Sequence, residues 1–351
     1  MLVIPGTNRK AALLSFRLGG TDGVSIEAAK WSHALRSLGF DITTVAGEGP
    51  VEHRLVGLAM GATDPPSRND LEQALMGVDL VVVENLCSLP LNPAAWRLTA
   101  ACLAGRPAIL RHHDLAWQRP HLGVDQPPPD DPAWVHVCIN DLSKKELADR
   151  GITATRIYNS FDTDPAPGRR QATREAIGLS RSDRLLVLQP TRAIARKRVD
   201  RALALAEALD GAYWLLGPAE DGYESEVRTT LQAARVPVKT GLPEGCDVAD
   251  AYAACDLVAF PSTWEGFGNP ALESAIRRRP LAIGDYPVAR ELAAFGFDWF
   301  GADDVEGIRE FFARGDQGLI EANFATAARH FASEGLPTSI RSLIEAAGWW
   351  R

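Results

Sequence analysis

The chain has 351 residues, enough for about two domains of ordinary size. Hydrophobic residues make up 46% and charged residues 23%, and the formal net charge of −8 argues against a general nucleic-acid binder. No apolar run approaches the roughly 20 residues that span a bilayer, the start lacks a signal-peptide pattern, and the five cysteines show no metal spacing. We therefore expect a cytoplasmic protein with reduced thiols, and a peripheral position at the inner membrane face is the alternative.

The chain opens with a strand, a glycine loop, a helix and a second strand, predicted at residues 11–16, 19–23, 24–38 and 40–46. This order is how a doubly wound α/β sheet begins. The loop reads GGTDG and not GxGxxG, and no acidic residue ends the second strand. The sequence therefore does not predict a dinucleotide site here, and a tight turn between strand and helix is the alternative reading of Gly19 and Gly20.

Alternating helices and strands are predicted next, at residues 70–76, 79–84, 96–104 and 107–110. The last of these strands delivers Arg111, His112, His113 and Asp114 to its carboxyl end. Ligands of open α/β sheets bind outside such ends, so these side chains are candidates for a site, with a structural role as the alternative. A strand at 135–139 and a helix at 144–150 follow.

Two features near the middle of the chain bear on metals and phosphates. Asp162-Thr163-Asp164 has the DxD form of a metal site, but prolines follow it and it lies in a predicted crossover, so we expect no metal there. The loop after the predicted strand 184–189 carries a group of basic residues, Arg192, Arg196, Lys197 and Arg198. Positive charge just before a helix start, here at 199–209, predicts a phosphate clamp, with a solvated basic face as the alternative.

The second half continues with elements predicted at 212–216, 224–234, 236–240 and 247–254, the first of which ends at Gly217. A buried strand at 257–260 then leads to Glu265 and the loop Gly266-Phe267-Gly268. Asn269 is a good N-cap and Pro270 a good first helical residue, so a helix carrying Glu273 begins there. Glycines let the backbone approach a ligand, and the free N–H groups of a helix start bind anions. The alternative is an ordinary strand-loop-helix unit with solvated glutamates.

The segment PSTWEGFGNPALE resembles the E-x7-E motif of the family 4 retaining glycosyltransferases, which have the GT-B fold. The resemblance runs along nearly the whole chain and is weakest in residues 47–67. It implies an α/β protein of two Rossmann-like doubly wound domains that face each other across a cleft. Residues 1–164 would form the acceptor domain and residues 165–330 the nucleotide-sugar domain. Residues 331–351 would form a last helix that packs back toward the first domain.

The resemblance also implies roles for individual residues. Arg192 and Lys197 would hold the donor diphosphate, Glu265 the donor sugar and Glu273 the ribose. His113 would lie beside the transferred sugar, and shifting the alignment by one residue would give His112 instead. The catalytic set is therefore His113, Arg192, Lys197 and Glu265, and the donor-binding set is Gly19, Gly20, Gly217, Gly266, Phe267, Gly268, Asn269 and Glu273. Arg198 replaces the family's usual glycine, which points to a local difference in the loop backbone.

The implied reaction is transfer of a hexosyl group, with retention, from a UDP-, GDP- or ADP-linked sugar to a sugar, lipid-linked or small-molecule hydroxyl. No metal or other cofactor is expected, because the cationic side chains and loop amides would stabilise the leaving diphosphate. The protein would act as a monomer or homodimer without nucleic acid. Two alternatives remain: a nucleotide-sugar 2-epimerase of the same architecture, and a catalytically silent subunit that binds nucleotide sugars.

Overall fold

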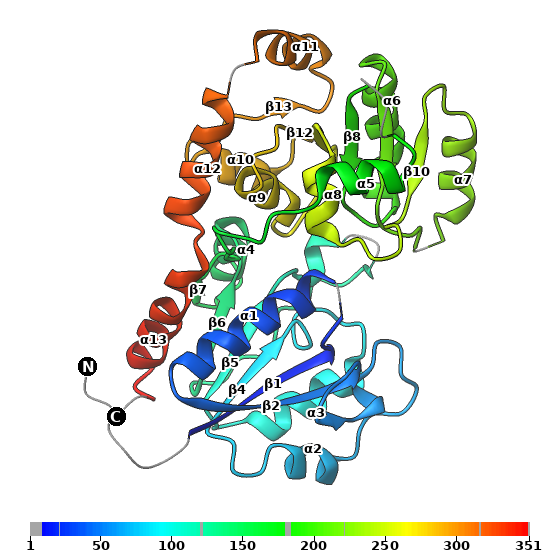
Figure 1. Cartoon of the computed structure of the whole chain (residues 1–351). Coiled ribbons are helices and arrows are strands. Elements are labelled where there is room, and N and C mark those ends of the chain that lie inside the picture. The colour runs from blue at the N-terminus through cyan, green and yellow to red at the C-terminus, as the bar shows by residue number, and fades with distance from the viewer. Residues whose placement is uncertain are drawn as a thin grey trace. The chain divides into compact units, whose positions relative to one another are not determined.

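The computed structural model describes residues 9–20, 22–119, 122–179, 184–220, 222–315 and 317–349. The chain divides into two compact units (Figure 1). The first unit comprises Met1–Ser160 and Ser333–Arg351, and the second comprises Phe161–Ala332. Each unit is built on one parallel sheet with its own hydrophobic core.

The sheet of the first unit has the order β3-β2-β1-β4-β5-β6-β7, and its strands pair in parallel. The order reverses between β1 and β4, and the carboxyl ends of strands beside such a reversal are where open α/β sheets bind ligands. The strands are β1 (Arg9–Arg17), β2 (Phe40–Glu48), β3 (His53–Arg54), β4 (Leu80–Glu84), β5 (Ala108–His112), β6 (Trp134–Cys138) and β7 (Ala154–Arg156).

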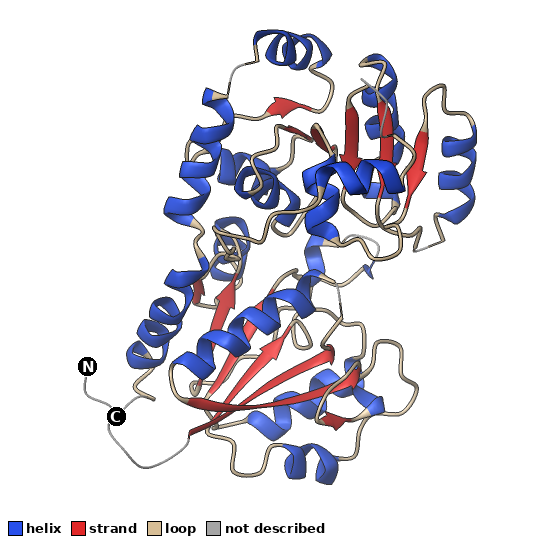
Figure 2. Cartoon of the chain, viewed as in Figure 1, coloured by secondary structure: helices blue, strands red, loops and turns tan. Residues whose placement is uncertain are grey.

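Helices cover both faces of this sheet (Figure 2). One face packs against α1 and α13, and the other packs against α2 and α3. Side-chain caps fix two of the helix starts, since Asp22 accepts from Val24 N and Asn92 accepts from Ala95 N. The helices are α1 (Gly23–Ser37), α2 (Arg68–Ala74), α3 (Pro93–Leu103), α4 (Asp141–Ala148) and α13 (Leu336–Ala346).

The sheet of the second unit has the order β10-β9-β8-β11-β12-β13, again parallel, and it reverses between β8 and β11. The loops that follow β8 and β11 therefore lie side by side at the carboxyl edge of the sheet. The strands are β8 (Leu186–Gln189), β9 (Ala212–Leu215), β10 (Val238–Thr240), β11 (Leu257–Phe260), β12 (Leu281–Ile283) and β13 (Phe300–Gly301).

Eight helices within the described part of the second unit surround its sheet. Apolar residues of α6, α7 and α11 share one core with β8, β9, β11 and β12. Helices α8 and α9 contact β8 and β11 respectively, and α12 packs on α9. The helices are α5 (Arg170–Ala176), α6 (Val199–Ala208), α7 (Glu224–Gln232), α8 (Val248–Ala254), α9 (Asn269–Ile276), α10 (Pro287–Ala293), α11 (Val305–Arg314) and α12 (Gly318–His330). Single 3₁₀ turns occur at Val56–Leu58, Ala116–Gln118, Ala195–Lys197 and Ser333–Gly335.

The prediction of two Rossmann-like α/β units is confirmed, and several local predictions are wrong. β3 was not predicted, and β5 runs on through His112 because Arg111 and His112 are themselves buried strand residues. The expected last helix is α13, which begins at Leu336 and not at residue 331, because a 3₁₀ turn at Ser333–Gly335 precedes it and Pro337 lies in its first turn. Within the described chain, no helix has the length and apolar character needed to cross a membrane.

Candidate functional site

The loop after β8 is held in place by a buried glutamine. Gln189 is the last residue of β8, and its Nε2 donates to the carbonyl of Lys197 at 2.9 Å. The Tyr213 hydroxyl, on the neighbouring strand β9, donates to Gln189 Oε1 at 2.5 Å. Both side chains are fully buried, so the two hydrogen bonds fix the turn Ala195–Lys197 against the sheet. The backbone of Lys197 is therefore positioned by residues that the sequence analysis did not single out.

Arg198, which follows this turn, has left-handed backbone torsions with φ 51° and ψ 59°. It is the N-cap residue of α6, and its guanidinium pairs with Asp200 in the first turn. A residue with a side chain is strained in this conformation, which favours glycine. The resembling family usually has a glycine at this position. Arg198 replaces that glycine, yet its backbone has the torsions that favour glycine.

Replacing Arg198 with glycine tests this strain. Glycine relieves the strain of the left-handed torsions, but it also makes the unfolded chain more flexible, which opposes the gain. The free energy of unfolding should therefore stay unchanged or rise by up to about 1 kcal/mol. Glycine at Arg201, inside α6, should instead lower it by about 1 kcal/mol. Urea unfolding of the two variants measures the difference, and equal losses would show that Arg198 is not strained.

The loop after β11 joins the loop after β8 through the main chain and leads into α9. Thr263 N donates to the carbonyl of Arg196 at 2.9 Å. Gly268 is the N-cap residue of α9 with φ 96°, so the chain needs a residue that tolerates positive φ at this point. Pro270 lies in the first turn, where its missing N–H costs nothing. The prediction of a helix start here is confirmed, but Asn269 is its first residue and not its N-cap, because Gly268 takes that place and no side chain caps the helix.

These two loops bring three charged side chains together at the reversal between β8 and β11. Lys197 Nζ contacts Glu265 Oε1, and Arg196 Nη1 donates to Glu265 Oε2 at 2.7 Å. The exposed fractions of Lys197 and Glu265 are 8% and 6%. The Lys197 ammonium also lies 5.1 Å from the centre of the Phe260 ring. We call Arg196, Lys197 and Glu265 the ion cluster, and it contains two cations and one carboxylate.

The pKa of each buried partner is shifted. Burial by itself raises the pKa of Glu265, but the charges of Lys197 and Arg196 outweigh it and bring this pKa below its usual value. Burial lowers the pKa of Lys197, and Glu265 acts in the opposite direction. Glu265 is therefore ionised at neutral pH. Because the cluster holds one more cation than carboxylate beside the N-terminus of α9, the local field favours an added anion.

Arg192 and Gly217 border the ion cluster without contacting Glu265. Arg192 Nη1 donates to Glu220 Oε2 at 2.5 Å, with side chains 41% and 39% exposed. Its positive charge still contributes to the lowered pKa of Lys197. A Cβ on Gly217 would lie 2.6 Å from the Arg192 N and Cα atoms. Gly217 is thus needed so that the loop after β9 can pack against the backbone of the β8 loop.

Glu273 and Phe267 each have a partner inside the second unit. The Tyr252 hydroxyl on α8 donates to Glu273 Oε2 at 2.7 Å. The Phe267 ring is buried, with Phe161 and Phe331 at centroid distances of 6.2 Å. The Phe267 side chain is therefore part of the core, and a contribution to ligand binding would come from its backbone.

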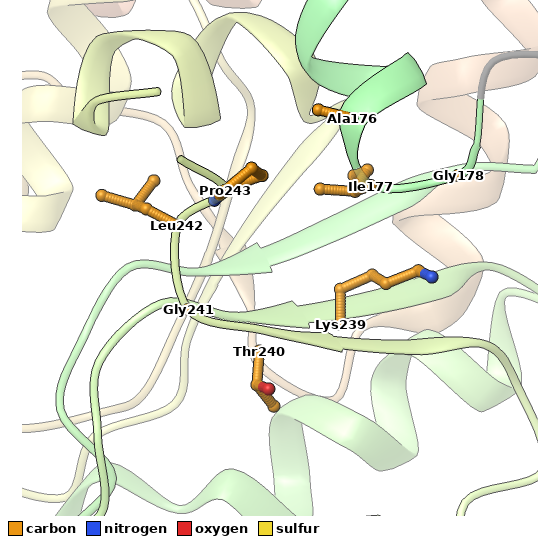
Figure 3. A pocket seen from close by; sticks show the side chains of 8 residues that line it. All are labelled: Ala176, Ile177, Gly178, Lys239, Thr240, Gly241, Leu242 and Pro243. Carbon is orange, nitrogen blue, oxygen red and sulfur yellow. The ribbon is translucent and has the colours of Figure 1, made fainter. Parts of the chain in front are cut away.

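A hollow of about 390 Å³ lies elsewhere on the second unit (Figure 3). Residues 176–178, at the end of α5, line one side, and residues 239–243, at the end of β10, line the other. The Trp214 indole holds the latter segment by donating to the carbonyl of Gly241 at 2.8 Å. None of the residues lining the hollow belongs to the ion cluster.

In the first unit, His113 belongs to a buried network of charged groups. Its Nε2 lies 2.6 Å from Glu84 Oε2, and Arg111 donates to Glu84 at 3.1 Å and to Glu27 at 3.2 Å. Burial opposes ionisation of Glu84, but Arg111 and His113 outweigh it and lower the pKa. The Arg111 guanidinium also lies 4.6 Å from the centre of the Trp31 ring. Glu84 thereby orients the imidazole of His113.

His112 belongs to a separate hydrogen-bonded chain of side chains. Its Nδ1 lies 2.6 Å from Ser88 Oγ, and its Nε2 lies 2.9 Å from Nδ1 of His136. His136 Nε2 in turn lies 3.1 Å from Asp130 Oδ1. Both ring nitrogens of His112 are therefore engaged, whereas one ring nitrogen of His113 has no hydrogen-bond partner among the described residues. This geometry favours His113 over His112 as a ligand-binding group.

Gly19 and Gly20 follow β1 at the carboxyl edge of the first unit's sheet, next to the reversal. A Cβ on Gly19 would lie 2.7 Å from Pro50 Cγ, so packing against this proline explains the glycine. A Cβ on Gly20 would lie 3.1 Å from Asp22 Oδ2. The structure thus gives structural reasons for this glycine loop, and its expected contact with ligand stays a prediction.

The structure brings Lys197 and Glu265 into direct contact and leaves Arg192 beside them. His113 takes part in a network with Arg111, which the strand-end pattern indicates, and with Glu27 and Glu84, which were not predicted. A signal existed for Glu84, since it ends the apolar strand DLVVVE with a charge. Asp162, of the DxD segment, accepts a hydrogen bond from Asp164 N at 2.9 Å. Among the described residues no three His, Cys, Asp or Glu side chains gather as a metal site.

Comparison with known proteins gives matches over most of the chain. Residues 171–303 match a family model described as "Glycosyl transferases group 1". The mannosylglucosylglycerate synthase of Petrotoga mobilis is 26% identical over 368 residues, covering 82% of this chain and 85% of that protein. The enzyme of the same name from Thermotoga maritima is 26% identical over 349 residues, with 80% and 81% covered.

Among solved structures, that of Anabaena HepE in complex with UDP and glucose is similar to this chain with a TM-score of 0.76. The match covers 97% of this chain and all (100%) of that one at 18% sequence identity. A likeness at this level of identity concerns the fold. It supports the assignment of the two units to the GT-B type of architecture.

Proposed function

We propose that this protein is a glycosyltransferase that moves a hexosyl group from a nucleoside-diphosphate sugar to an acceptor hydroxyl. The observation that carries the proposal is the ion cluster, a buried carboxylate between two cations beside the N-terminus of α9. The match of residues 171–303 to the glycosyl transferases group 1 model spans this cluster. The names of both curated relatives are those of glycoside synthases, which favours transfer over epimerisation or a silent binding subunit.

The second unit would bind the donor. Lys197, Arg192 and the amides of Gly266, Gly268 and Asn269 would stabilise negative charge on the diphosphate as its bond to the sugar breaks. A well-aimed group of this kind is worth a few kcal/mol of transition-state stabilisation, so no metal is required. Glu265, ionised and held by its two cations, would accept hydrogen bonds from hydroxyls of the donor sugar. Glu273 would accept those of the ribose.

The proposed stereochemistry is retention, as in the resembling family. The new bond joins the acceptor oxygen to the anomeric carbon, and the bond from that carbon to the phosphate oxygen breaks with its electron pair on the diphosphate. The leaving phosphate would take the acceptor proton on the same face of the sugar. His113, oriented by Glu84, would contact the transferred sugar through its other ring nitrogen.

The acceptor proposed is a small hydroxylated compound, because the relatives' name contains glycerate and two sugars and no lipid. Glyceric acid and glucosylglycerate are therefore the first acceptors to test. NMR of the product gives the anomeric configuration, and inversion would contradict the proposed mechanism.

The direct test of the function is a thermal-shift panel of UDP, GDP and ADP with their glucose and mannose esters. A ligand at 100 times its dissociation constant stabilises the folded protein by about 2.7 kcal/mol, which raises the melting temperature by several degrees. We expect one nucleotide series to do so. No shift with any of them, at millimolar concentrations, would contradict the proposal.

A further inference from the structure

Tyr286 places a buried hydroxyl without a partner next to the candidate site. It follows β12 and precedes α10, and only 1% of it is exposed. Its ring packs edge-on against Phe260, with centroids 6.3 Å apart and planes at 88°. Its hydroxyl makes no hydrogen bond to the described residues. Packing therefore accounts for the ring of Tyr286 and leaves its hydroxyl unexplained.

The hydroxyl is directed at the start of α9. A Cβ on Gly268, the N-cap residue of that helix, would lie 2.5 Å from Tyr286 Oη. Burial raises the pKa of Tyr286, and the negative charge of Glu265 raises it further, so the hydroxyl stays protonated. An O–H donor is thus held beside the backbone of Gly268, and the charge of Glu265 acts on it.

Unsatisfied polar atoms are concentrated in this part of the second unit. Ser262 Oγ and Trp264 Nε1, in the loop after β11, are also buried without a partner. A Cβ on Gly284 would lie 2.1 Å from the Ser262 carbonyl, so the loops after β11 and β12 are packed together. A buried donor left unpaired destabilises a fold, and most such donors in proteins have a partner. Their accumulation around Glu265 indicates that a partner arrives with a ligand.

We propose that the hydroxyl of Tyr286 donates a hydrogen bond to a hydroxyl oxygen of the bound donor sugar and so helps to select that sugar. The inference rests on the proposed function, which gives Glu265 the role of accepting a hydrogen bond from the sugar. A sugar hydroxyl can donate to the Glu265 carboxylate and accept from the Tyr286 hydroxyl at once, which suits this pair of groups. Because Gly268 has no side chain, only its backbone lies beside the Tyr286 hydroxyl at the start of α9.

Tyr286→Phe tests the inference because it removes the hydroxyl and keeps the ring on Phe260. Loss of an unpaired donor should leave the melting temperature of the free protein unchanged or higher. Tyr213→Phe is the matched control, since the Tyr213 hydroxyl is equally buried but has Gln189 as its partner. That variant should melt at a lower temperature. If the Tyr286 hydroxyl is unpaired in the free protein, only Tyr213→Phe should therefore lower the melting temperature.

Binding is then compared by calorimetry, using whichever of UDP-glucose, ADP-glucose or GDP-mannose stabilises the natural chain, and its free diphosphate. Tyr286→Phe should bind the sugar ester roughly 3- to 10-fold more weakly and the free diphosphate equally well. Equal affinity for both ligands in the natural chain and the variant would overturn the inference. If the variant binds the sugar ester and the free diphosphate more weakly by the same factor, the Tyr286 hydroxyl donates to the phosphate, and the assignment to the sugar is wrong.

Monodeoxy analogues of the same donor provide a second test that includes the natural chain. One analogue, lacking the hydroxyl that Tyr286 contacts, should bind the natural chain more weakly and should lose less from Tyr286→Phe than the parent donor does. If the loss from Tyr286→Phe is the same for every analogue, the inference is wrong. If the natural chain binds none of the three donors, the result contradicts the proposed function itself and not only the role of Tyr286.

Discussion

Replacing Lys197 with methionine is expected to lower the free energy of unfolding by roughly 3 kcal/mol and to weaken nucleoside-diphosphate binding about 10- to 100-fold. The stability loss follows because Glu265 stays buried with only Arg196 to compensate its charge. The expected loss of stability lies at the lower end of the range for a broken buried ion pair, because Arg196 remains beside Glu265. The affinity loss is that of one charge-assisted hydrogen bond to phosphate.

The double variant Lys197→Met/Glu265→Gln separates stability from binding. Removing both charges of a buried pair leaves no uncompensated carboxylate, so the double variant should regain most of the stability lost in Lys197→Met. Binding should not recover, because the cation that would meet the diphosphate is still absent. Urea unfolding and calorimetric titration measure the two properties. Recovery of both would show that Lys197 acts only by stabilising the fold.

Acidification from pH 6.5 to pH 5 is expected to lower the free energy of unfolding by up to about 3 kcal/mol, through His112 and His136 together. Burial, the main cause, lowers the pKa of both histidines, and for His112 the neighbouring His136 and His113 lower it further. For His136 the Asp130 carboxylate opposes the shift. The sign follows because the unfolded chain takes up protons below about pH 6.5 while the folded chain does not. The stabilisation contributed by the two neutral histidines is therefore fully present above the pKa that they have in the unfolded chain. It is lost as the pH falls toward their lowered pKa in the folded protein.

Matched variants identify the source of this pH dependence. In His136→Gln the amide still donates toward Asp130 and one titrating group is gone, so the loss over the same window should be about half. His33→Gln changes an exposed histidine, and the dependence of the free energy of unfolding on pH should be the same as in the natural chain. Chemical unfolding at a series of pH values gives the slopes. A flat profile between pH 6.5 and pH 5 would show that His112 and His136 are not held neutral.

Much of the fold could be predicted because its signals are local. The strand Leu257–Phe260 was predicted from an apolar run, and a helix carrying Glu273 was predicted from the proline at its start. The N-cap was predicted one residue too late, because Gly268 and not Asn269 takes that place. Element bounds failed where buried polar residues continue an element, as at Arg111 and His112 in β5.

The candidate site was predicted in part. The sequence placed Lys197 and Glu265 in loops after two strands, and their contact follows once those strands are neighbours at the reversal of the sheet. Which cation meets Glu265 depends on side-chain direction, and the structure pairs it with Arg196 as well as Lys197, while Arg192 pairs with Glu220. No local pattern shows such directions. The same holds for Tyr286, whose hydroxyl is notable only for its missing partner.

The central claim, a diphosphate bound at the ion cluster, is tested most directly by one calorimetric comparison. The nucleoside diphosphate selected by the thermal-shift panel is titrated into the natural chain and into the folded Lys197→Met/Glu265→Gln variant. We expect saturable binding to the natural chain and binding at least about tenfold weaker to the variant. Equal affinity of the two proteins would contradict the claim.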